Sequence, residues 1–198
     1  MRLLLAAAST AIAAQSVSAD LLMSEIYWNN DSGVADWFEL TNTGTTAIST
    51  AGLFYDDDSA DATKDDGLSS LTIGAGESVI FLVSWEDDFA SSADAISAFN
   101  AEWSYSGAIG FVDGGSGLGG GGDAAYVFDG NGVSANVLTF LEYPDTGIIG
   151  DGATWTPGGL TTSGSLSFSG VLGTPGAIPA PGALALLGLA GLGRRRRG

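Results

Sequence analysis

An all-β fold, and within that class a β-sandwich, is predicted by three observations. Short β-prone segments recur between residues 21 and 142, and turn residues separate them. Within residues 20–177, only residues 91–103 have the apolar spacing of a helix, with Ile96, Phe99 and Trp103 three and four positions apart. No internal repeat of fixed period is present. Strands at short intervals with one short helix are typical of two packed antiparallel sheets.

The first two strands are expected at residues 21–28 and 36–42. The first is apolar and stops at the turn residues 29–33. The second alternates, so one face of the strand should carry Trp37, Glu39 and Thr41, and the other Phe38, Leu40 and Asn42. We expect Trp37 or Phe38 to fill the core, and Asn42 with Gly44 to form the turn that ends the strand.

The later strands are expected at residues 52–55, 71–77 and 78–84, and in a hairpin of residues 124–129 and 133–142. Residues 78–84 are almost continuously apolar, which predicts a strand covered on both faces. The Gly-Asn-Gly sequence at 130–132 is a typical hairpin turn. Residues 158–176 are rich in Gly, Ser and Thr and are interpreted as a last strand followed by a flexible lead.

The charge of the chain is strongly asymmetric. All 23 acidic residues lie between Asp20 and Asp151, whereas five of the six basic residues are Arg2 and the four arginines at 194–197. Only Lys64 opposes the acids within the body, which leaves that body with a formal charge of −22. Such a field repels phosphate backbones, so we expect no nucleic-acid partner.

The residue types that most enzymes use are missing. The chain has no cysteine and no histidine, which removes thiol chemistry, imidazole bases and every Ser-His-Asp arrangement. Lys64 is the only cation of the body, so cationic clamps for oxyanions or phosphates are nearly excluded. The composition favours a protein that is not an enzyme.

The first nineteen residues have the plan of a secretory signal peptide. Arg2 precedes an apolar run, and the sequence Val17-Ser18-Ala19 supplies the small residues of a cleavage site. We expect cleavage after Ala19. One domain should then fill residues 20–177, a length that can bury its own core.

The last residues, 178–198, predict a short hydrophobic helix with a basic end. Their apolar run, after Pro179-Ala180-Pro181, is followed by Arg194, Arg195, Arg196 and Arg197. A helix over residues 178–193 is about 24 Å long, shorter than the roughly 30 Å hydrocarbon core of a bilayer. The arginines should stay on the cytoplasmic side. The tail therefore predicts a temporary stop at the inner membrane with the body outside.

This tail resembles the PEP-CTERM sorting signal, although Ala180 stands where that motif has Glu. The resemblance implies recognition by an exosortase-like transpeptidase or protease and cleavage near Pro179–Pro181. It also implies release to the cell surface or extracellular matrix, where exopolysaccharide or cell-surface glycans are the expected partners. An ordinary tail anchor is the alternative.

The body resembles the lamin-tail domain, an immunoglobulin-like β-sandwich. The element Trp37-Phe38-Glu39-Leu40-Thr41-Asn42-Thr43-Gly44 carries most of the resemblance, and weaker matches follow in the family's order at residues 24–26, 48–53, 71–79, 122–129 and 174–177. Residues 84–114 depart from the pattern, and no Arg stands near Trp155. The resemblance implies binding or scaffolding without catalysis.

Acidic clusters are the only candidates for a chemical site. The hard oxygen ligands that Ca²⁺ prefers are available from Asp56, Asp58, Asp61, Asp65 and Asp66, and Ca²⁺ is the one candidate cofactor. Their spacing differs from that of an EF-hand loop, because Ala60 stands where an acid or Asn belongs. A solvated acidic loop is the alternative. A second set around the glycine tract contains Asp113, Asp123, Asp129 and Asn131.

Three functions remain open from the sequence. The first is a non-catalytic matrix or adhesion protein of the cell surface. The second is a secreted hydrolase that uses a pair of carboxylates, for which Glu25, Glu39, Glu77, Glu86, Glu102 and Glu142 are available. The third is a Ca²⁺-dependent carbohydrate-binding module of the same sandwich class. A buried pair of acids in a cleft would favour the hydrolase. A loss of thermal stability on adding a chelator would favour the calcium module.

Overall fold

The protein is all-β, with several sheets and one short α-helix. The structure, a computed structural model, describes residues 20–28, 33–64, 66–114, 117–145 and 152–177. The elements run in the order β1 (Leu21–Tyr27), β2 (Asp36–Asn42), β3 (Ile48–Ser49), β4 (Phe54–Asp56), β5 (Thr72–Ile73), β6 (Ser78–Val83), the 3₁₀ turn η1 (Trp85–Asp87), α1 (Ser92–Trp103), β7 (Ile109–Phe111), β8 (Gly122–Phe128), β9 (Val137–Pro144), β10 (Trp155–Thr156), β11 (Gly159–Leu160), β12 (Ser165–Leu166) and β13 (Leu172–Gly173).

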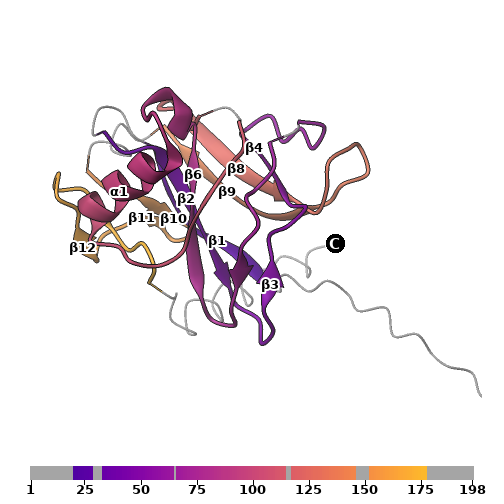
Figure 1. Cartoon of the computed structure of the whole chain (residues 1–198), viewed down its shortest axis with the longest axis horizontal. Coiled ribbons are helices and arrows are strands. Elements are labelled where there is room, and N and C mark those ends of the chain that lie inside the picture. The colour runs from indigo at the N-terminus through magenta and orange to yellow at the C-terminus, as the bar shows by residue number, and fades with distance from the viewer. Residues whose placement is uncertain (1–19, 29–32, 65, 115–116, 146–151, 178–198) are drawn as a thin grey trace, which may run out of the picture.

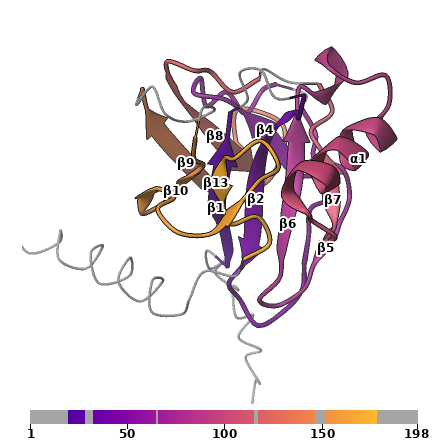
Figure 2. The same ribbon diagram turned by 90° about the vertical axis from the view of Figure 1, so that its left-hand side faces the viewer.

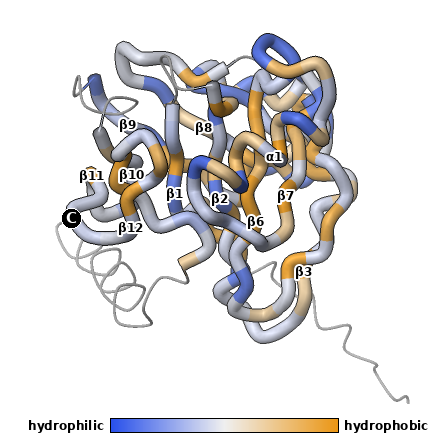
Figure 3. Tube along the Cα trace, turned by 60° about the vertical axis from the view of Figure 1, so that its left-hand side comes forward, coloured by the Kyte–Doolittle hydropathy of each residue, from blue (hydrophilic) through white to orange (hydrophobic). Residues whose placement is uncertain are grey.

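Two sheets pack face to face and enclose the main core. The larger sheet has the order β11-β10-β1-β2-β6-β7, and its β6–β7 pair is parallel. The smaller sheet has the order β4-β8-β9. Side chains from both sheets, including Phe38, Phe81, Tyr55 and Val127, meet in one buried cluster. Figure 3 shows hydrophobic segments in β6 and in the neighbouring edge strand β7.

A second core lies on the opposite face of the larger sheet, beneath α1 (Figures 1 and 2). Trp37 of β2 packs edge-on against Phe99 and Trp103 of the helix, with ring centroids 5.6 Å apart in both pairs. The strand alternation is therefore confirmed, with Phe38 between the sheets and Trp37 under the helix. Both faces of β2 and β6 are covered, as the continuous apolar run of β6 predicted.

The predicted helix is confirmed with nearly the predicted limits. Ser91 is the N-cap, and its side chain accepts a hydrogen bond from the Asp94 backbone N–H. Ser104 ends the helix in the left-handed conformation, with φ 52°. Ala95, Phe99 and Trp103 form its buried face, while Ile96 is only half-buried.

Two other predictions need correction. Residues 133–136 belong to the hairpin loop, because the Asp129 carboxylate accepts hydrogen bonds from the backbone N–H and side-chain amide of Asn136 at 2.7 and 2.8 Å. Those bonds close a longer loop before β9 begins at Val137. Residues 158–176 form β11, β12 and β13 rather than one strand and a flexible lead.

The predicted turn at the end of β2 is confirmed. The Asn42 side-chain oxygen accepts from the Gly44 backbone N–H at 2.9 Å, which is the bond of an Asx turn. Its amide nitrogen donates to the carbonyls of Thr46 and Ile73 at 2.8 and 2.9 Å.

Within the described residues, no helix is both long and apolar enough to cross a membrane.

Candidate functional site

Two buried glutamates face each other at the centre of the larger sheet. Glu25 of β1 and Glu39 of β2 are register partners, and each is 1% exposed. The register shifts between Met23 and Glu25, which is a β-bulge at Ser24. The bulge lets Met23 and Ile26 both face the main core, while Glu25 points to the same side as Glu39 and Trp37.

Glu25 binds the C-terminal segment of the described chain. One carboxylate oxygen accepts from the Thr174 backbone N–H at 2.8 Å, and the other accepts from the Thr174 hydroxyl at 3.0 Å. The hydroxyl of Thr154, itself bonded to Thr161 at 2.7 Å, donates to the first oxygen. Both oxygens of Glu25 are thus occupied by donors from segments far along the chain.

Glu39 binds the next residues of the same segment. Its Oε2 accepts from the backbone N–H of Gly176, and its Oε1 accepts from the Ser24 hydroxyl at 2.5 Å. Ser24 also bonds Thr41, and Thr41 bonds Ser78, each at 2.7 Å between hydroxyl oxygens. This row of hydroxyls continues from Glu39 across β2 to β6. We call Glu25 and Glu39 together the glutamate clasp.

The clasp is built from two acids that resist ionisation. Burial and, to a smaller extent, the nearby Glu25 carboxylate together raise the pKa of Glu39 from 4.5 to about 7, against the hydrogen bonds that lower it. Burial also raises the pKa of Glu25, again opposed by its bonds to Thr154 and Thr174. Because the two carboxyls are neighbours, they titrate as a pair and disfavour a doubly charged state.

A third glutamate fastens the preceding turn in the same way. Glu102 of α1 is 9% exposed, and its carboxylate accepts from the backbone N–H and hydroxyl of Ser169 at 2.9 and 3.1 Å. Its backbone carbonyl accepts from the Phe168 N–H at 2.7 Å. Three buried glutamates therefore hold residues 168–176 against the helix and the larger sheet.

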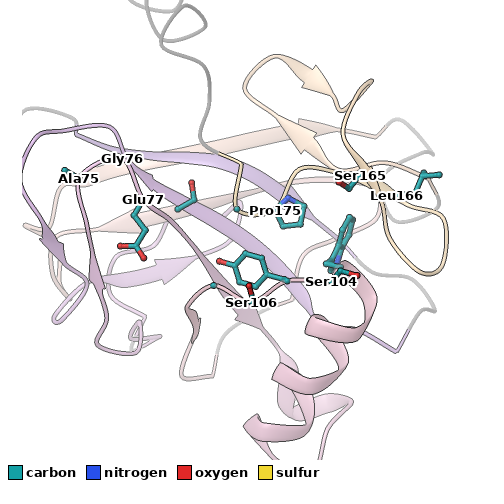
Figure 4. Close-up of a pocket in the computed structure, with 13 residues that line it drawn as sticks. Ala75, Gly76, Glu77, Ser104, Ser106, Ser165, Leu166 and Pro175 are labelled. Atoms are coloured by element: carbon teal, nitrogen blue, oxygen red, sulfur yellow. The ribbon is translucent and has the colours of Figure 1, made fainter.

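An open groove of about 840 Å³ lies over this segment. Figure 4 shows Glu77 on one side, Ser165 and Leu166 on the other, and Pro175 between them. Tyr105 also lines the groove, and burial together with the charges of Glu39 and Glu77 raises its pKa to about 12. The clasp acids are absent from the groove's lining, although Gly176, whose N–H bonds Glu39, belongs to it.

The geometry of the clasp differs from that of a carboxylate pair in a hydrolase. Hydrolysis of a glycosidic bond needs space for the sugar and a water molecule between the two carboxyls. Here the donors of Thr174 and Gly176 occupy the carboxylate oxygens, and both acids are almost fully excluded from solvent. The arrangement can bind a peptide segment and store a proton.

The carboxylates of two predicted calcium ligands, Asp56 and Asp61, are engaged in local hydrogen bonds. Asp56 is 1% exposed and accepts from the Ser59 hydroxyl and the Asp61 N–H, both at 2.5 Å, with Lys64 4.0 Å away. Asp61 accepts from the hydroxyl and N–H of Thr63, and these bonds lower the pKa of Asp61. Asp58 is exposed, and Asp66 contributes its carbonyl to Tyr55 N–H at 2.8 Å. Asp65 lies outside the described residues.

Among the described residues, no three acidic side chains are grouped as metal ligands. The calcium site stays a prediction, and thermal unfolding tests it. Because a ligand that binds only the folded state raises Tm, Ca²⁺ should raise it and a chelator should reverse the rise. If neither Ca²⁺ nor the chelator changes Tm, residues 56–66 form an acidic loop that is closed by its own hydrogen bonds and binds no Ca²⁺.

The second acidic set is not one site. Asp123 and Asp129 lie near opposite ends of β8. Asp123 closes the glycine tract, because it accepts from the backbone N–H groups of Gly119, Ala124 and Asp58. Asp129 closes the hairpin loop, and the Asp113 N–H donates to the Gly67 carbonyl at 2.8 Å.

The predicted processing sites lie outside the described residues. These are the cleavage site at Ala19 and the sorting residues Pro179, Ala180, Pro181, Arg194, Arg195, Arg196 and Arg197.

The glutamate clasp was not predicted from the sequence, although Glu25 and Glu39 were both among the acids available for a carboxylate pair. The available signal was the position of Glu39 between Trp37 and Thr41 on one strand face, which is the face that α1 and the C-terminal segment cover.

Fold and site together define an acidic all-β protein whose C-terminal segment is held by buried glutamates. No family model matches this chain, and no curated protein matches it.

Proposed function

We propose that this chain is a non-catalytic exported protein of the cell surface or extracellular matrix, with a structural or adhesive role. Its body is an immunoglobulin-like sandwich of the lamin-tail type, and an exosortase-like enzyme sorts it through residues 178–198. The signal-peptide plan before Asp20 and the Pro-x-Pro, apolar and arginine pattern of the tail are the sequence grounds for this proposal.

The observation that carries the proposal is the glutamate clasp. β1 begins at Leu21, the second residue after the expected cleavage at Ala19, and Ala177 still donates its N–H to the Thr174 carbonyl at 2.8 Å. A protein attached through its tail transmits load through residues 174–177. The clasp passes that load to β1 and β2 in the middle of the larger sheet.

The accessible chemistry supports a role without catalysis. The groove's lining includes one ionisable acid, Glu77, whose carboxylate accepts the Gly74 N–H at 2.7 Å. The single body cation, Lys64, lies beside Asp56 in the acidic loop. The groove therefore offers no pair of carboxylates, which argues against glycoside hydrolysis there.

Mass spectrometry of the protein recovered from cells that express the full chain with an exosortase tests this function. The expected mature mass lacks residues 1–19 and ends near Pro179–Pro181, and the protein should be accessible to protease on intact cells. Replacing the four arginines at 194–197 by alanine should stop tail cleavage, whereas Lys64→Ala is the control that leaves it unchanged. Full-length chain inside the cell would overturn the proposal.

A further inference from the structure

The outer face of the smaller sheet carries an aromatic pair, half-buried Tyr126 and exposed Phe140, beside carboxylates. Tyr126 of β8 and Phe140 of β9 are register partners, and their rings are stacked with centroids 5.2 Å apart and an interplanar angle of 9°. Phe140 is 52% exposed, although it occupies the middle of a strand. We call Tyr126, Phe140 and Glu142 the aromatic strip.

The strip is held in a defined geometry. Glu142 accepts a hydrogen bond from the Tyr126 hydroxyl at 2.7 Å, and this bond is the largest cause of a Tyr126 pKa raised to about 12. Phe128 flanks Tyr126, with ring centroids 6.3 Å apart. Rigid, pre-oriented rings lose little conformational entropy when a ligand binds. The strip therefore holds apolar surface at a fixed position, and nothing else in the described chain buries the Phe140 ring.

The charges around the strip are negative. Glu142 is exposed, Asp58 is near enough to raise the pKa of Tyr126, and Asp56 is the register partner of Tyr126 on β4. The one cation of the body, Lys64, is 4.0 Å from Asp56. With a body charge of −22, this face repels anionic polymers and attracts cationic ones.

A ligand that fits must offer apolar faces for the rings and positive groups for the carboxylates. Sugar rings present C–H faces and hydroxyl donors, and amino sugars add a protonated amine that can bond a carboxylate or lie over an aromatic ring. We propose that the aromatic strip binds a polysaccharide with free amino groups. This inference deepens the proposed adhesive role by giving the displayed body a class of ligand, and it rests on that role for its biological meaning.

Calorimetric titration of the purified full chain with a β-1,4-linked glucosamine hexamer tests the inference. The detergent that keeps the tail dispersed must lack a sugar headgroup, and the pH must keep the amines protonated. Phe140→Ala should weaken binding about tenfold, since an aromatic contact contributes on the order of 1 kcal/mol. Glu142→Gln should weaken it several-fold through the lost charge.

The matched control is Phe168→Ala, because Phe168 is 91% exposed but lies outside the strip, between β12 and β13. It should leave the affinity unchanged. The fully acetylated, neutral hexamer should bind more weakly, and raised salt should weaken binding of the amino hexamer.

Three outcomes would overturn the inference. They are no binding of the hexamer, equal affinity of the Phe140→Ala and unchanged chains, and equal affinity for the neutral hexamer. Polylysine serves as a cationic polymer without sugar rings. If Phe140→Ala changes neither the polylysine affinity nor the hexamer affinity, the attraction comes from the negative charge of the body alone. None of these results alters the processing and surface exposure that test the proposed function.

Discussion

Replacing Glu39 by glutamine is expected to flatten the dependence of stability on pH and to stabilise the protein above neutral pH. The folded-state pKa of Glu39, about 7, lies above the value of 4.5 for the free side chain. Between pH 4.5 and about 7, Glu39 therefore keeps its proton in the folded state and has released it in the unfolded state. Stability is fully present below about pH 4.5 and falls as pH rises through 7, by about 3 kcal/mol.

The glutamine variant should keep the local hydrogen bonds. Its amide oxygen can accept the Gly176 N–H, and the Ser24 hydroxyl can reverse and accept from the amide nitrogen. Urea unfolding at a series of pH values from 5 to 8 measures the effect. A residual slope should remain in the variant, because burial also raises the pKa of Glu25.

Glu77→Gln is the matched control for this experiment. It removes the same charge from an exposed residue at the edge of the groove, so it should leave the slope close to that of the unmodified protein. A Glu39→Gln variant with an unchanged slope would show that another group takes up the proton. The expected contrast between the two variants separates the buried acid from the general repulsion of the acidic surface.

Replacing Glu25 by alanine is expected to release the C-terminal segment and destabilise the protein. Thr174 loses the acceptor for its N–H and its hydroxyl, and the fully buried Thr154 hydroxyl loses a partner as well. A buried donor left unsatisfied costs about 1–3 kcal/mol. Because removal of the acid also relieves its burial and its repulsion of Glu39, we expect a net loss of about 2–4 kcal/mol.

Amide hydrogen exchange measures where that loss falls. The N–H groups of Thr174 and Gly176 should lose protection before the strands β1 and β2 do, because local opening needs only the segment to detach. Glu25→Gln keeps an acceptor for Thr174 and should retain most of the protection. Unchanged exchange at Thr174 in the alanine variant would contradict the role of Glu25 in holding this segment.

Local sequence patterns predicted those parts of the fold that local physics controls. The alternation at 36–42 placed Phe38 and Trp37 on opposite faces, and the continuous apolar run of β6 predicted burial on both. Helix α1 followed from the apolar spacing of residues 91–103. Each signal depends on neighbours within a few residues, so it can be interpreted without knowledge of the partner strands.

The contacts of the clasp could not be predicted in that way. The pairing of Glu25 with Glu39 depends on the strand register and on the bulge at Ser24, and a shift by one residue would turn either acid to the other face. Ser24 is a nearby donor, but the other donors come from Thr154, Thr174 and Gly176, which are more than a hundred residues away along the chain. Nothing in residues rich in Gly, Ser and Thr indicates which of them will meet a buried carboxylate.

The sequence by itself determined an all-β class, an excess of negative charge and the absence of histidine and cysteine, because composition and periodicity are properties of the chain alone. Tertiary structure alone decided that buried carboxylates hold the C-terminal segment and that Tyr126 and Phe140 stand together on an exposed sheet face. The physical reason is that burial and pairing are set by long-range packing. The same glutamate is a solvated surface acid or a neutral buried acceptor according to what the rest of the chain places over it.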